Sequence, residues 1–205
     1  MAKKCLVLVD IQNDFLEGGN LAVPHANEVI SIANQMIDSF DFVISTQDWH
    51  PANHGSFASQ HPGKNPGELI ELYGLQQVLW PDHCVQGSFG AEFHKDLNTN
   101  KIEKIFPKGQ DKTVDSYSGF FDNGKKLATG MGEYLQAQSV TDIYVMGLAL
   151  DYCVKFTAVD AKDLDLNVHL LLDGCRAVNL QAGDDEKAVK EMQSYGIRIL
   201  RSTEV

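Results

Sequence analysis

Residues 5–10 read Cys-Leu-Val-Leu-Val-Asp, an unbroken apolar run that stops at a carboxylate. A run of this kind, without alternating polar residues, is typical of a strand buried on both faces of a parallel sheet. Similar short runs recur along the chain, and each is interpreted as a further strand. They are Phe42–Ser45, Lys104–Phe106, Ile143–Met146, Val168–Leu172 and Ile197–Leu200.

Between most of these runs, apolar residues recur at the spacing of one helix face. For the last helix we expect Asp184 or Asp185 as the N-cap and Gly196, in the left-handed conformation, as the end. Alternating strands and helices predict an α/β fold of three αβα layers, doubly wound around a mainly parallel sheet of about six strands. The helical faces are Val29, Ile30, Ala33 and Ile37; Leu127, Met131, Tyr134 and Leu135; Val154, Thr157, Ala158, Ala161 and Leu164; and Ala188, Val189, Met192 and Tyr195.

The segment 47–101 interrupts this alternation, because Pro, Gly, Asn and His are dense there and periodicity is weak. Loops of this length are usually functional or disordered. Since the segment also carries aromatic residues, we interpret it as an ordered loop insertion. No repeat or linker marks a boundary, so we expect a single domain over residues 1–205.

The composition excludes several classes of partner. Seventeen Lys and Arg against twenty-eight Asp and Glu give a formal charge of −11, which repels phosphate backbones and anionic lipid. No apolar run approaches the length of a membrane span, and residues 5–9 are too short for a secretory signal. The four cysteines form no C-x-x-C pair, which indicates free thiols in a reducing, cytoplasmic protein. The oligomeric state, a homo-oligomer included, stays open.

Polar residues that follow the predicted strands are the first candidates for function, because ligands of an open parallel sheet collect beyond the carboxyl ends of its strands. The first strand ends at Asp10, and the second leads into Gln47-Asp-Trp-His50. The third is followed by Lys108, and the fourth by Gly147-Leu-Ala-Leu-Asp-Tyr-Cys153. An acid, a cation and a thiol thus follow three strands of one predicted sheet.

Cys153 begins the predicted helix after the fourth strand, where unpaired N–H groups and the helix dipole favour a thiolate. That position favours a nucleophile over the alternative, a small thiol packed in the core. The core interpretation is kept for Cys5 and Cys175. Cys84 is also interpreted as packing.

Asp10 ends a hydrophobic strand, where an unpaired carboxylate would be costly, so we expect a partner and take Lys108 as the candidate. Two interpretations stay open. The pair is either a structural ion pair, or it places beside the thiol a base that takes its proton and passes it to a leaving amine.

Asp48 and His50, with His54 four residues later, indicate a metal cluster, because carboxylate oxygen and imidazole nitrogen suit zinc, iron or manganese. His83, at the far end of the long loop, would close the site. The alternative is a set of surface or core histidines, and for His54 the two interpretations are balanced. We keep that alternative for His25, His61, His94 and His169.

These residues carry a resemblance to a known family. The chain resembles the nicotinamidases of the isochorismatase-like cysteine hydrolases, from the first predicted strand to the last. The segments that carry the resemblance are Leu8-Val-Asp-Ile-Gln-Asn-Asp-Phe15, Thr46-Gln-Asp-Trp-His-Pro51, Asn53-His54-Gly-Ser-Phe57, Trp80-Pro-Asp-His-Cys-Val-Gln-Gly87, Pro107-Lys-Gly109, Tyr117-Ser-Gly-Phe120 and Gly147 to Cys153.

The resemblance implies a triad of Asp10, Lys108 and Cys153 that deamidates nicotinamide to nicotinate and ammonia through a thioester, a step of NAD salvage. In this scheme Asp10 takes the thiol proton and Lys108 maintains the charge balance. It also implies a non-proline cis peptide before Ala149, with the N–H groups of Ala149 and Cys153 forming the oxyanion hole.

By the same resemblance, one divalent ion is held by Asp48, His50 and His83, with His54 at or just outside the ligand shell. Zinc is the first choice, with iron or manganese as alternatives. The ion receives the pyridine nitrogen. The walls of the aromatic pocket are then Phe15, Trp80 and Tyr117.

Two other functions compete with this interpretation. An isochorismatase-like amidase acting on another small carboxamide would lack the Asp48, His50 and His83 set. A receiver-type module also places carboxylates and a lysine around a divalent ion, but needs neither a histidine cluster nor a thiol. A dinucleotide-binding module fits less well, because Asp10 is followed by Ile-Gln-Asn and not by a glycine-rich turn.

Overall fold

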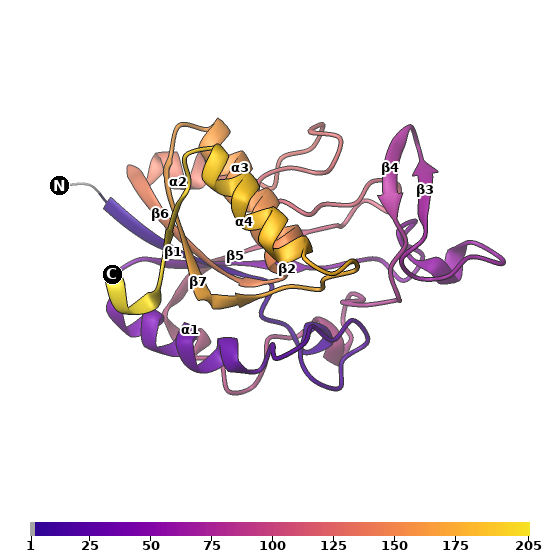
Figure 1. The fold of residues 1–205 in the computed structure, drawn as a ribbon, viewed down its shortest axis with the longest axis horizontal. Helices are drawn as coiled ribbons and strands as arrows, with labels where there is room; N and C mark the ends of the chain where they lie inside the picture. Colours follow the sequence, from indigo (N-terminus) through magenta and orange to yellow (C-terminus); the bar gives the residue numbers. More distant parts are fainter. Residues whose placement is uncertain (1–2) are drawn as a thin grey trace.

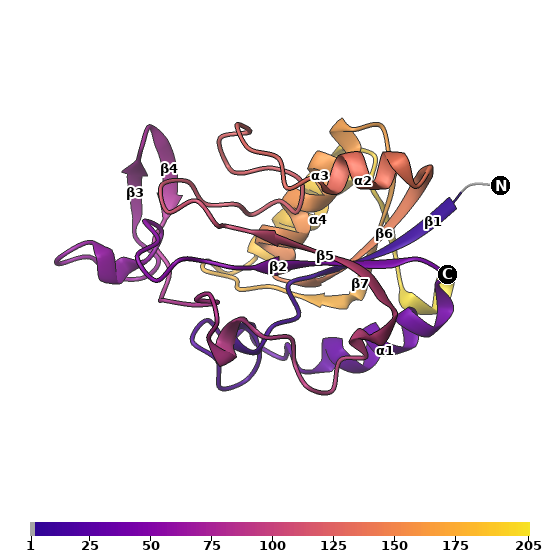
Figure 2. The ribbon, with the colours of Figure 1, turned by 180° about the vertical axis from the view of Figure 1, so that it is seen from behind.

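The computed structural model describes residues 3–205 and shows one central sheet with helices on both sides (Figures 1 and 2). The sheet has six strands in the order β5-β2-β1-β6-β7-β8, and every neighbouring pair is parallel. The predicted three-layer, doubly wound architecture is therefore confirmed. The strands are β1 (Lys3–Val9), β2 (Val43–Asp48), β5 (Ile102–Lys108), β6 (Val140–Leu148), β7 (Asn167–Arg176) and β8 (Arg198–Leu200).

The helices divide between the two faces of the sheet. Helix α1 (Glu28–Ser39) covers one face, whereas α2 (Met131–Ala137), α3 (Lys155–Asp163) and α4 (Asp184–Ser194) cover the other (Figure 1). The apolar positions of α1 that were predicted from periodicity, Val29, Ile30, Ala33 and Ile37, are all buried. Within residues 3–205, no helix combines the length and hydrophobicity that crossing a bilayer requires.

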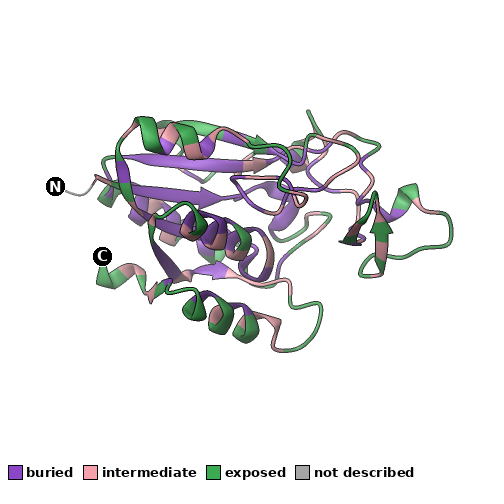
Figure 3. Cartoon of the chain, turned by 90° about the horizontal axis from the view of Figure 1, so that it is seen from above, coloured by how far each residue is buried: buried purple, intermediate pink, exposed green. Residues whose placement is uncertain are grey.

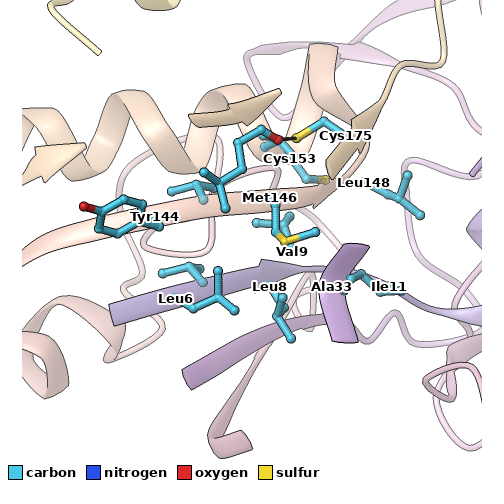
Figure 4. Close-up of a cluster of buried hydrophobic side chains, with 14 of the residues drawn as sticks. Leu6, Leu8, Val9, Ile11, Ala33, Tyr144, Met146, Leu148, Cys153 and Cys175 are labelled. Carbon is cyan, nitrogen blue, oxygen red and sulfur yellow. Dashed lines mark hydrogen bonds between the residues drawn. The ribbon is translucent and has the colours of Figure 1, made fainter. Parts of the chain in front are cut away.

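The first strand lies at the centre of the core. Residues 5–9 are fully buried, because β1 pairs with β2 on one edge and with β6 on the other and is covered on both faces. Figure 4 shows Leu6, Leu8 and Val9 of β1 beside Tyr144 and Met146 of β6. This explains why the run has no alternating polar residue. It also fixes where the chain leaves the sheet at Asp10.

The long loop is more structured than predicted. It contains an antiparallel hairpin of β3 (Leu69–Leu72) and β4 (Leu75–Val78), together with short 3-10 turns. The hairpin projects at the end of the molecule opposite to both termini, and much of its surface is exposed (Figures 1 and 3). Its tight turn uses left-handed conformations at Tyr73 and Gly74, with φ of 48° and 85°. Such a pair forms the favoured two-residue hairpin turn.

Two local predictions about helix ends are wrong. Leu127 is 56% exposed and precedes α2, which begins only after Gly130. The N-cap of α4 is Gly183 and not an aspartate, and Asp184 instead accepts a hydrogen bond from the N–H of Gln181. Gly183 occupies this position because the chain enters α4 with a φ of +86°, which favours glycine. The prediction for Gly196 is confirmed, with a φ of +76°.

Candidate active site

The direction of winding reverses between β1 and β6. From β1 the chain moves outward through β2 to β5, and it then returns to β6 on the other side of β1 and continues to β7 and β8. Such a reversal leaves a crevice at the carboxyl ends of the strands. The predicted polar residues all leave the sheet at this edge, from the ends of β1, β2, β5 and β6.

Asp10 and Lys108 form a fully buried ion pair. Asp10 is 0% exposed, and its backbone turns out of β1 with a φ of 48°. Its Oδ1 accepts a hydrogen bond of 2.6 Å from the Thr46 hydroxyl, and its Oδ2 lies 2.9 Å from Lys108 Nζ. Oδ2 nevertheless accepts no hydrogen bond of good geometry from any group in residues 3–205. An acceptor position on Asp10 is therefore free for a proton.

Lys108 connects the remaining parts of the site. Its Nζ donates to Asp48 Oδ1 at 2.7 Å, to the Ser116 carbonyl at 2.9 Å and to Cys153 Sγ at 3.3 Å. Carboxylate oxygens of Asp10 and Asp48 and the sulfur of Cys153 all lie within 4.8 Å of one another. The ammonium therefore holds two carboxylates and the thiol around a single charge.

Cys153 lies in a π-helical turn, Leu150–Val154, that joins β6 to α3. The turn follows a cis peptide between Leu148 and Ala149, at the position that the family resemblance implies. The Ala149 carbonyl accepts hydrogen bonds from the N–H groups of Tyr152 and Val154 rather than from that of Cys153. The irregular turn thus sets the nucleophile candidate directly over the end of β6.

The electrostatics of the site oppose a permanent thiolate. Burial raises the pKa of Cys153 well above its ordinary value; Lys108 lowers it, but Asp10 and Asp48 add to the rise. Burial also raises the pKa of Asp10, with Lys108 opposing. Burial disfavours the charged form of Lys108, yet the two carboxylates hold its pKa well above the usual range. Burial therefore favours the neutral thiol at Cys153 and makes Asp10 a stronger base, while the two carboxylates favour the charged form of Lys108.

The thiolate expected at Cys153 from its place at a helix start stays a prediction, and burial of the sulfur opposes it. A helix dipole acts on groups within the first turn of the helix. Here the residue is 6% exposed and lies in a π-helical turn before α3 begins, so desolvation dominates. The proton must leave during the reaction, and Asp10 is the adjacent acceptor.

A second cluster lies on the other side of Asp48. Its Oδ2 is 3.2 Å from His50 Nε2 and 3.5 Å from His83 Nε2. All three side chains are buried, and their ligand atoms lie within 4.8 Å of one another. The structure thus brings together the three residues that the sequence analysis proposed as metal ligands, although His83 comes from the far end of the long loop.

The hydrogen bonds of the two histidines fit a metal ion. His50 Nδ1 lies 2.9 Å from the Gly109 carbonyl, and His83 Nδ1 lies 2.8 Å from the Pro81 carbonyl. Because a carbonyl oxygen only accepts, each Nδ1 must carry a proton, and in the neutral ring each Nε2 then presents its lone pair to Asp48. His50 Nε2 is buried without a hydrogen-bond partner in the described residues. Neutral rings fixed in this way, with Nε2 facing a carboxylate oxygen, suit a metal ion between them.

Gly109 makes this arrangement sterically feasible. A Cβ built at this position would lie 2.3 Å from Cε1 of the His50 ring, and φ is +66°. Asp48 is held with similar precision by Gln12, whose side-chain amide donates to the Asp48 carbonyl and accepts from the Asp48 N–H, both at 2.8 Å. Both ligands are therefore oriented by contacts outside the cluster.

His54 lies directly beside the proposed metal ligands. The ring centroids of His50 and His54 are 4.3 Å apart. His54 Nδ1 lies 2.7 Å from the Ser56 hydroxyl and accepts the Ser56 N–H at 3.2 Å. Burial lowers the pKa of His54 to about 4, which keeps the ring neutral. Ligand atoms of His50, His54 and Asp115 also lie within 4.8 Å of one another, so the place of His54 at or just outside the ligand shell stays a prediction.

A pocket joins the thiol to the metal cluster. It is lined by Cys153 and Ala149 and also by Asp48 and His83. The aromatic residues proposed from the sequence line the same pocket, and Trp80 Nε1 donates to the Tyr117 hydroxyl at 3.2 Å. The remaining lining residues are Phe15, Leu21, Trp80, Asp115, Tyr117, Tyr152 and Val178.

Several residues of this site were not predicted from the sequence. Asp115 and Tyr152 line the pocket, Thr46 bonds the base, and Gln12 orients Asp48. A signal existed for Thr46, Gln12 and Tyr152, because all three lie in the segments that carry the family resemblance. Asp115 lies outside those segments, and its position depends on how the loop folds.

Replacing His50 with alanine should abolish metal binding. The variant removes one of the two imidazoles and leaves Asp48 and His83, which are too few ligands for a stable site. Elemental analysis of the purified variant measures the effect. His94→Ala is the matched control, because His94 lies on the same long loop but outside the cluster, and it should keep the metal. An unchanged metal content in His50→Ala would contradict the assigned cluster.

Comparison with known proteins agrees with this geometry. Residues 4–204 match the family model described as the isochorismatase domain. The nicotinamidase of Escherichia coli K12 is 49% identical over 200 residues, covering 96% of this chain and 93% of that protein.

Two solved structures extend the comparison. The nicotinamidase/pyrazinamidase of Acinetobacter baumannii aligns with a TM-score of 0.96 at 43% identity, covering 100% of this chain and 98% of that one. A pyrazinamidase of Pyrococcus horikoshii, solved in complex with zinc, aligns with a TM-score of 0.79 at 33% identity and covers 97% and 99% of the two chains. The chain therefore belongs to the isochorismatase family of hydrolases.

Proposed function

We propose that this protein is a metal-containing cysteine amidohydrolase that deamidates nicotinamide to nicotinate and ammonia. One observation carries the proposal: a single pocket with aromatic walls is lined both by Cys153 and by Asp48 and His83 of the metal cluster. A flat heteroaromatic carboxamide carries its reactive carbon and its ring nitrogen on one small ring, so one such pocket can present both the thiol and the metal ligands to it. The nicotinamidase relatives support the same substrate.

The residues around the thiol supply the chemistry of amide cleavage. Asp10 accepts the Cys153 proton at its free Oδ2 position while the sulfur attacks the carboxamide carbon. The N–H groups of Ala149 and Cys153 stabilise the oxyanion that develops. Asp10 then passes the proton to the leaving ammonia, and a thioester remains on Cys153. Water, deprotonated by Asp10, cleaves the thioester and releases nicotinate.

Lys108 maintains the charge balance of this cycle. Its ammonium contacts Asp10, Asp48 and Cys153 and remains protonated because its pKa is held high by the two carboxylates, against the effect of burial. When the sulfur becomes an anion, the cation is already 3.3 Å away. No reorganisation of charge is then needed as the proton moves.

Asp48, His50 and His83 would hold one divalent ion, with zinc as the proposed metal and iron or manganese as alternatives. When bound, the ion supplies a Lewis acid that receives the pyridine nitrogen and so orients the ring. Phe15, Trp80 and Tyr117 form the walls that position the ring from its faces and edges. The zinc-bound pyrazinamidase of P. horikoshii supports zinc.

The same proposal treats the whole chain as a single catalytic domain. It also places the protein in the cytoplasm, because the four cysteines are all buried free thiols and a reducing compartment keeps them so.

Catalysis should fail at low pH as Asp10 becomes protonated. The base must be ionised to accept the thiol proton, so activity is present above its pKa and lost as the pH falls through it. Because burial raises the pKa of Asp10 from the ordinary value of 3.8, the acid limb of kcat/KM should lie above that pH. A pH profile at saturating metal measures this. The residual activity of Asp10→Asn should no longer show the limb; if it does, another group is the base.

An ammonia-release assay tests the proposed function directly. Nicotinamide, other small carboxamides and isochorismate are compared with and without a chelator, followed by addition of zinc. Nicotinamide should release ammonia, chelation should stop the release, and zinc should restore it. Retained nicotinamide turnover in metal-stripped protein would instead favour a metal-independent amidase of different specificity. Tight NAD binding without ammonia release would favour a nucleotide-binding module.

A further inference from the structure

Two spaces lie next to each other beside the nucleophile, and two tyrosines separate them. The inner space is the pocket that contains Cys153. The outer space is a groove between β4 of the hairpin and helices α3 and α4, lined on these elements by residues such as Val78, Phe156 and Ala188. The two spaces share only Tyr117 and Tyr152 as lining residues. Their rings therefore form the partition between pocket and groove.

The two spaces differ greatly in size. The inner pocket leaves about 20 Å³, whereas the outer groove encloses about 340 Å³. These volumes count the space that the centre of a water-sized sphere can occupy. One water needs roughly 10–15 Å³ of such space, so the pocket has room for little more than a single water. An aromatic carboxamide can enter only if one of the walls moves, and the groove is the space into which a wall can move.

Of the two partition residues, Tyr117 is anchored. Its hydroxyl lies 3.1 Å from Gln77 Nε2 and 3.2 Å from Trp80 Nε1, and both nitrogens are donors. Gln77 is itself buried and also donates to Asp115 Oδ2 at 3.0 Å. Any displacement of the Tyr117 ring would break these bonds, so Tyr117 is the fixed part of the partition.

Tyr152 is held by packing contacts and not by a hydrogen bond of its hydroxyl to any group in residues 3–205. It packs edge-to-face on Trp80 and Tyr117, with centroid distances of 4.9 and 5.3 Å. Burial, followed by the charges of Asp151 and Asp184, raises the pKa of Tyr152 to about 12, so the ring is uncharged. Rotation of this side chain costs packing contacts but breaks no hydrogen bond of its hydroxyl.

The backbone beneath Tyr152 is fixed, in contrast to its side chain. Both carboxylate oxygens of the preceding residue, Asp151, accept backbone N–H groups, from Val178 at 3.0 Å and from Asn179 at 2.8 Å. The Tyr152 N–H donates to the Ala149 carbonyl. A movement that opens the partition is therefore a side-chain rotation that leaves Cys153 in place.

We propose that Tyr152 determines which amides reach Cys153: its ring moves toward the outer groove to admit a single flat ring, and on return it rejects carboxamides that extend beyond one ring. The outer groove is then a latent subsite for that extension. This inference rests on the proposed function. It assigns to Tyr152 a role in selectivity and none in bond making or breaking.

The lining of the groove indicates the kind of extension that fits. Val78, Phe156 and Ala188 supply apolar surface. The two lysines do not make it an anion site, because Lys155 pairs with Glu191 and Lys187 with Asp184, each at 3.0 Å. An uncharged, fused aromatic ring suits this surface better than a phosphate or a carboxylate.

The test compares nicotinamide with quinoline-3-carboxamide, which carries one fused ring more. Tyr152→Ala should raise the ratio of kcat/KM for the bicyclic amide to that for nicotinamide by about tenfold or more, because the excluding wall is gone. Tyr152→Phe keeps the ring and should keep the low ratio. Tyr152→Leu, which also removes the ring, replaces the alanine variant if circular dichroism shows that Tyr152→Ala does not fold. A general loss of catalytic competence would lower both rates and leave the ratio unchanged.

Binding separates this inference from the proposed function. The same two amides are titrated calorimetrically into metal-loaded Cys153→Ala with Tyr152 intact or replaced, so that no turnover is needed. If the parent protein releases no ammonia from nicotinamide, the proposed function fails, yet the binding ratio still tests the partition. A folded Tyr152→Ala or Tyr152→Leu variant with unchanged ratios in both turnover and binding would overturn the inference.

Discussion

Replacing Cys153 with alanine should abolish ammonia release from nicotinamide while the fold and the bound metal persist. The sulfur is the only atom of the site that can form the thioester, and loss of a covalent nucleophile typically costs about 10⁴-fold or more in kcat. The side chain is small, lies beside Lys108 and is not one of the proposed metal ligands, so metal content should not change. Ammonia release, circular dichroism and elemental analysis measure the three properties.

A second buried cysteine provides the matched control. Cys5 is as buried as Cys153 but lies inside β1, with its sulfur near the Leu6 carbonyl. Cys5→Ala should lose some stability, as any truncation in a packed core does, and retain turnover. Turnover of nicotinamide by Cys153→Ala at the rate of the Cys5 variant would eliminate the covalent mechanism.

Replacing Lys108 with methionine should strongly destabilise the protein. The substitution keeps an unbranched chain of similar length but removes the cation between Asp10 and Asp48, so two buried carboxylates lose their partner. Breaking a buried pair by removing one member costs about 3–5 kcal/mol. Urea unfolding with a chelator present measures this free energy without a contribution from metal loss.

Two companion variants show whether the buried charge is the cause. In the Lys108→Met background, Asp10→Asn removes one of the stranded charges and should recover part of the lost stability. Lys101→Met breaks an exposed pair with Asp38 and should cost no more than about 1 kcal/mol. If Lys108→Met lowered the free energy of unfolding no more than Lys101→Met does, Lys108 would not be the charged partner of the two buried carboxylates.

Much of the fold could be predicted because its central strands are buried on both faces. Runs such as residues 5–10 have no polar alternation because β1 has a parallel neighbour on each edge and helices cover both faces.

The hairpin within residues 47–101 was missed although a signal existed. Tyr73-Gly74 separates two four-residue runs, as a two-residue hairpin turn requires. The runs Leu69–Leu72 and Leu75–Val78 are short, however, and half of their residues are polar or exposed.

The residues of the candidate site that lie at strand ends could be predicted from the sequence. Asp10, Asp48 and Lys108 each stand at or just after the end of a strand, so the topology of a parallel sheet brings them together. No such rule predicts the positions of residues that lie on loops. Tyr152 became relevant only when its ring was seen between two spaces. The protonation of Cys153 could not be predicted either, because it depends on the degree of burial and not on position in the chain.

The space left at Gly109 matters for metal binding, although Gly109 is not itself a ligand. The His50 imidazole rests where a methyl group would otherwise stand, so the chelating geometry depends on an atom that the chain omits. Metal binding therefore depends partly on the absence of a side chain at Gly109, although this residue supplies neither a ligand atom nor a charge. A search for related metal sites that compares only the ligand residues would accept sequences in which a Cβ at position 109 displaces the His50 ring.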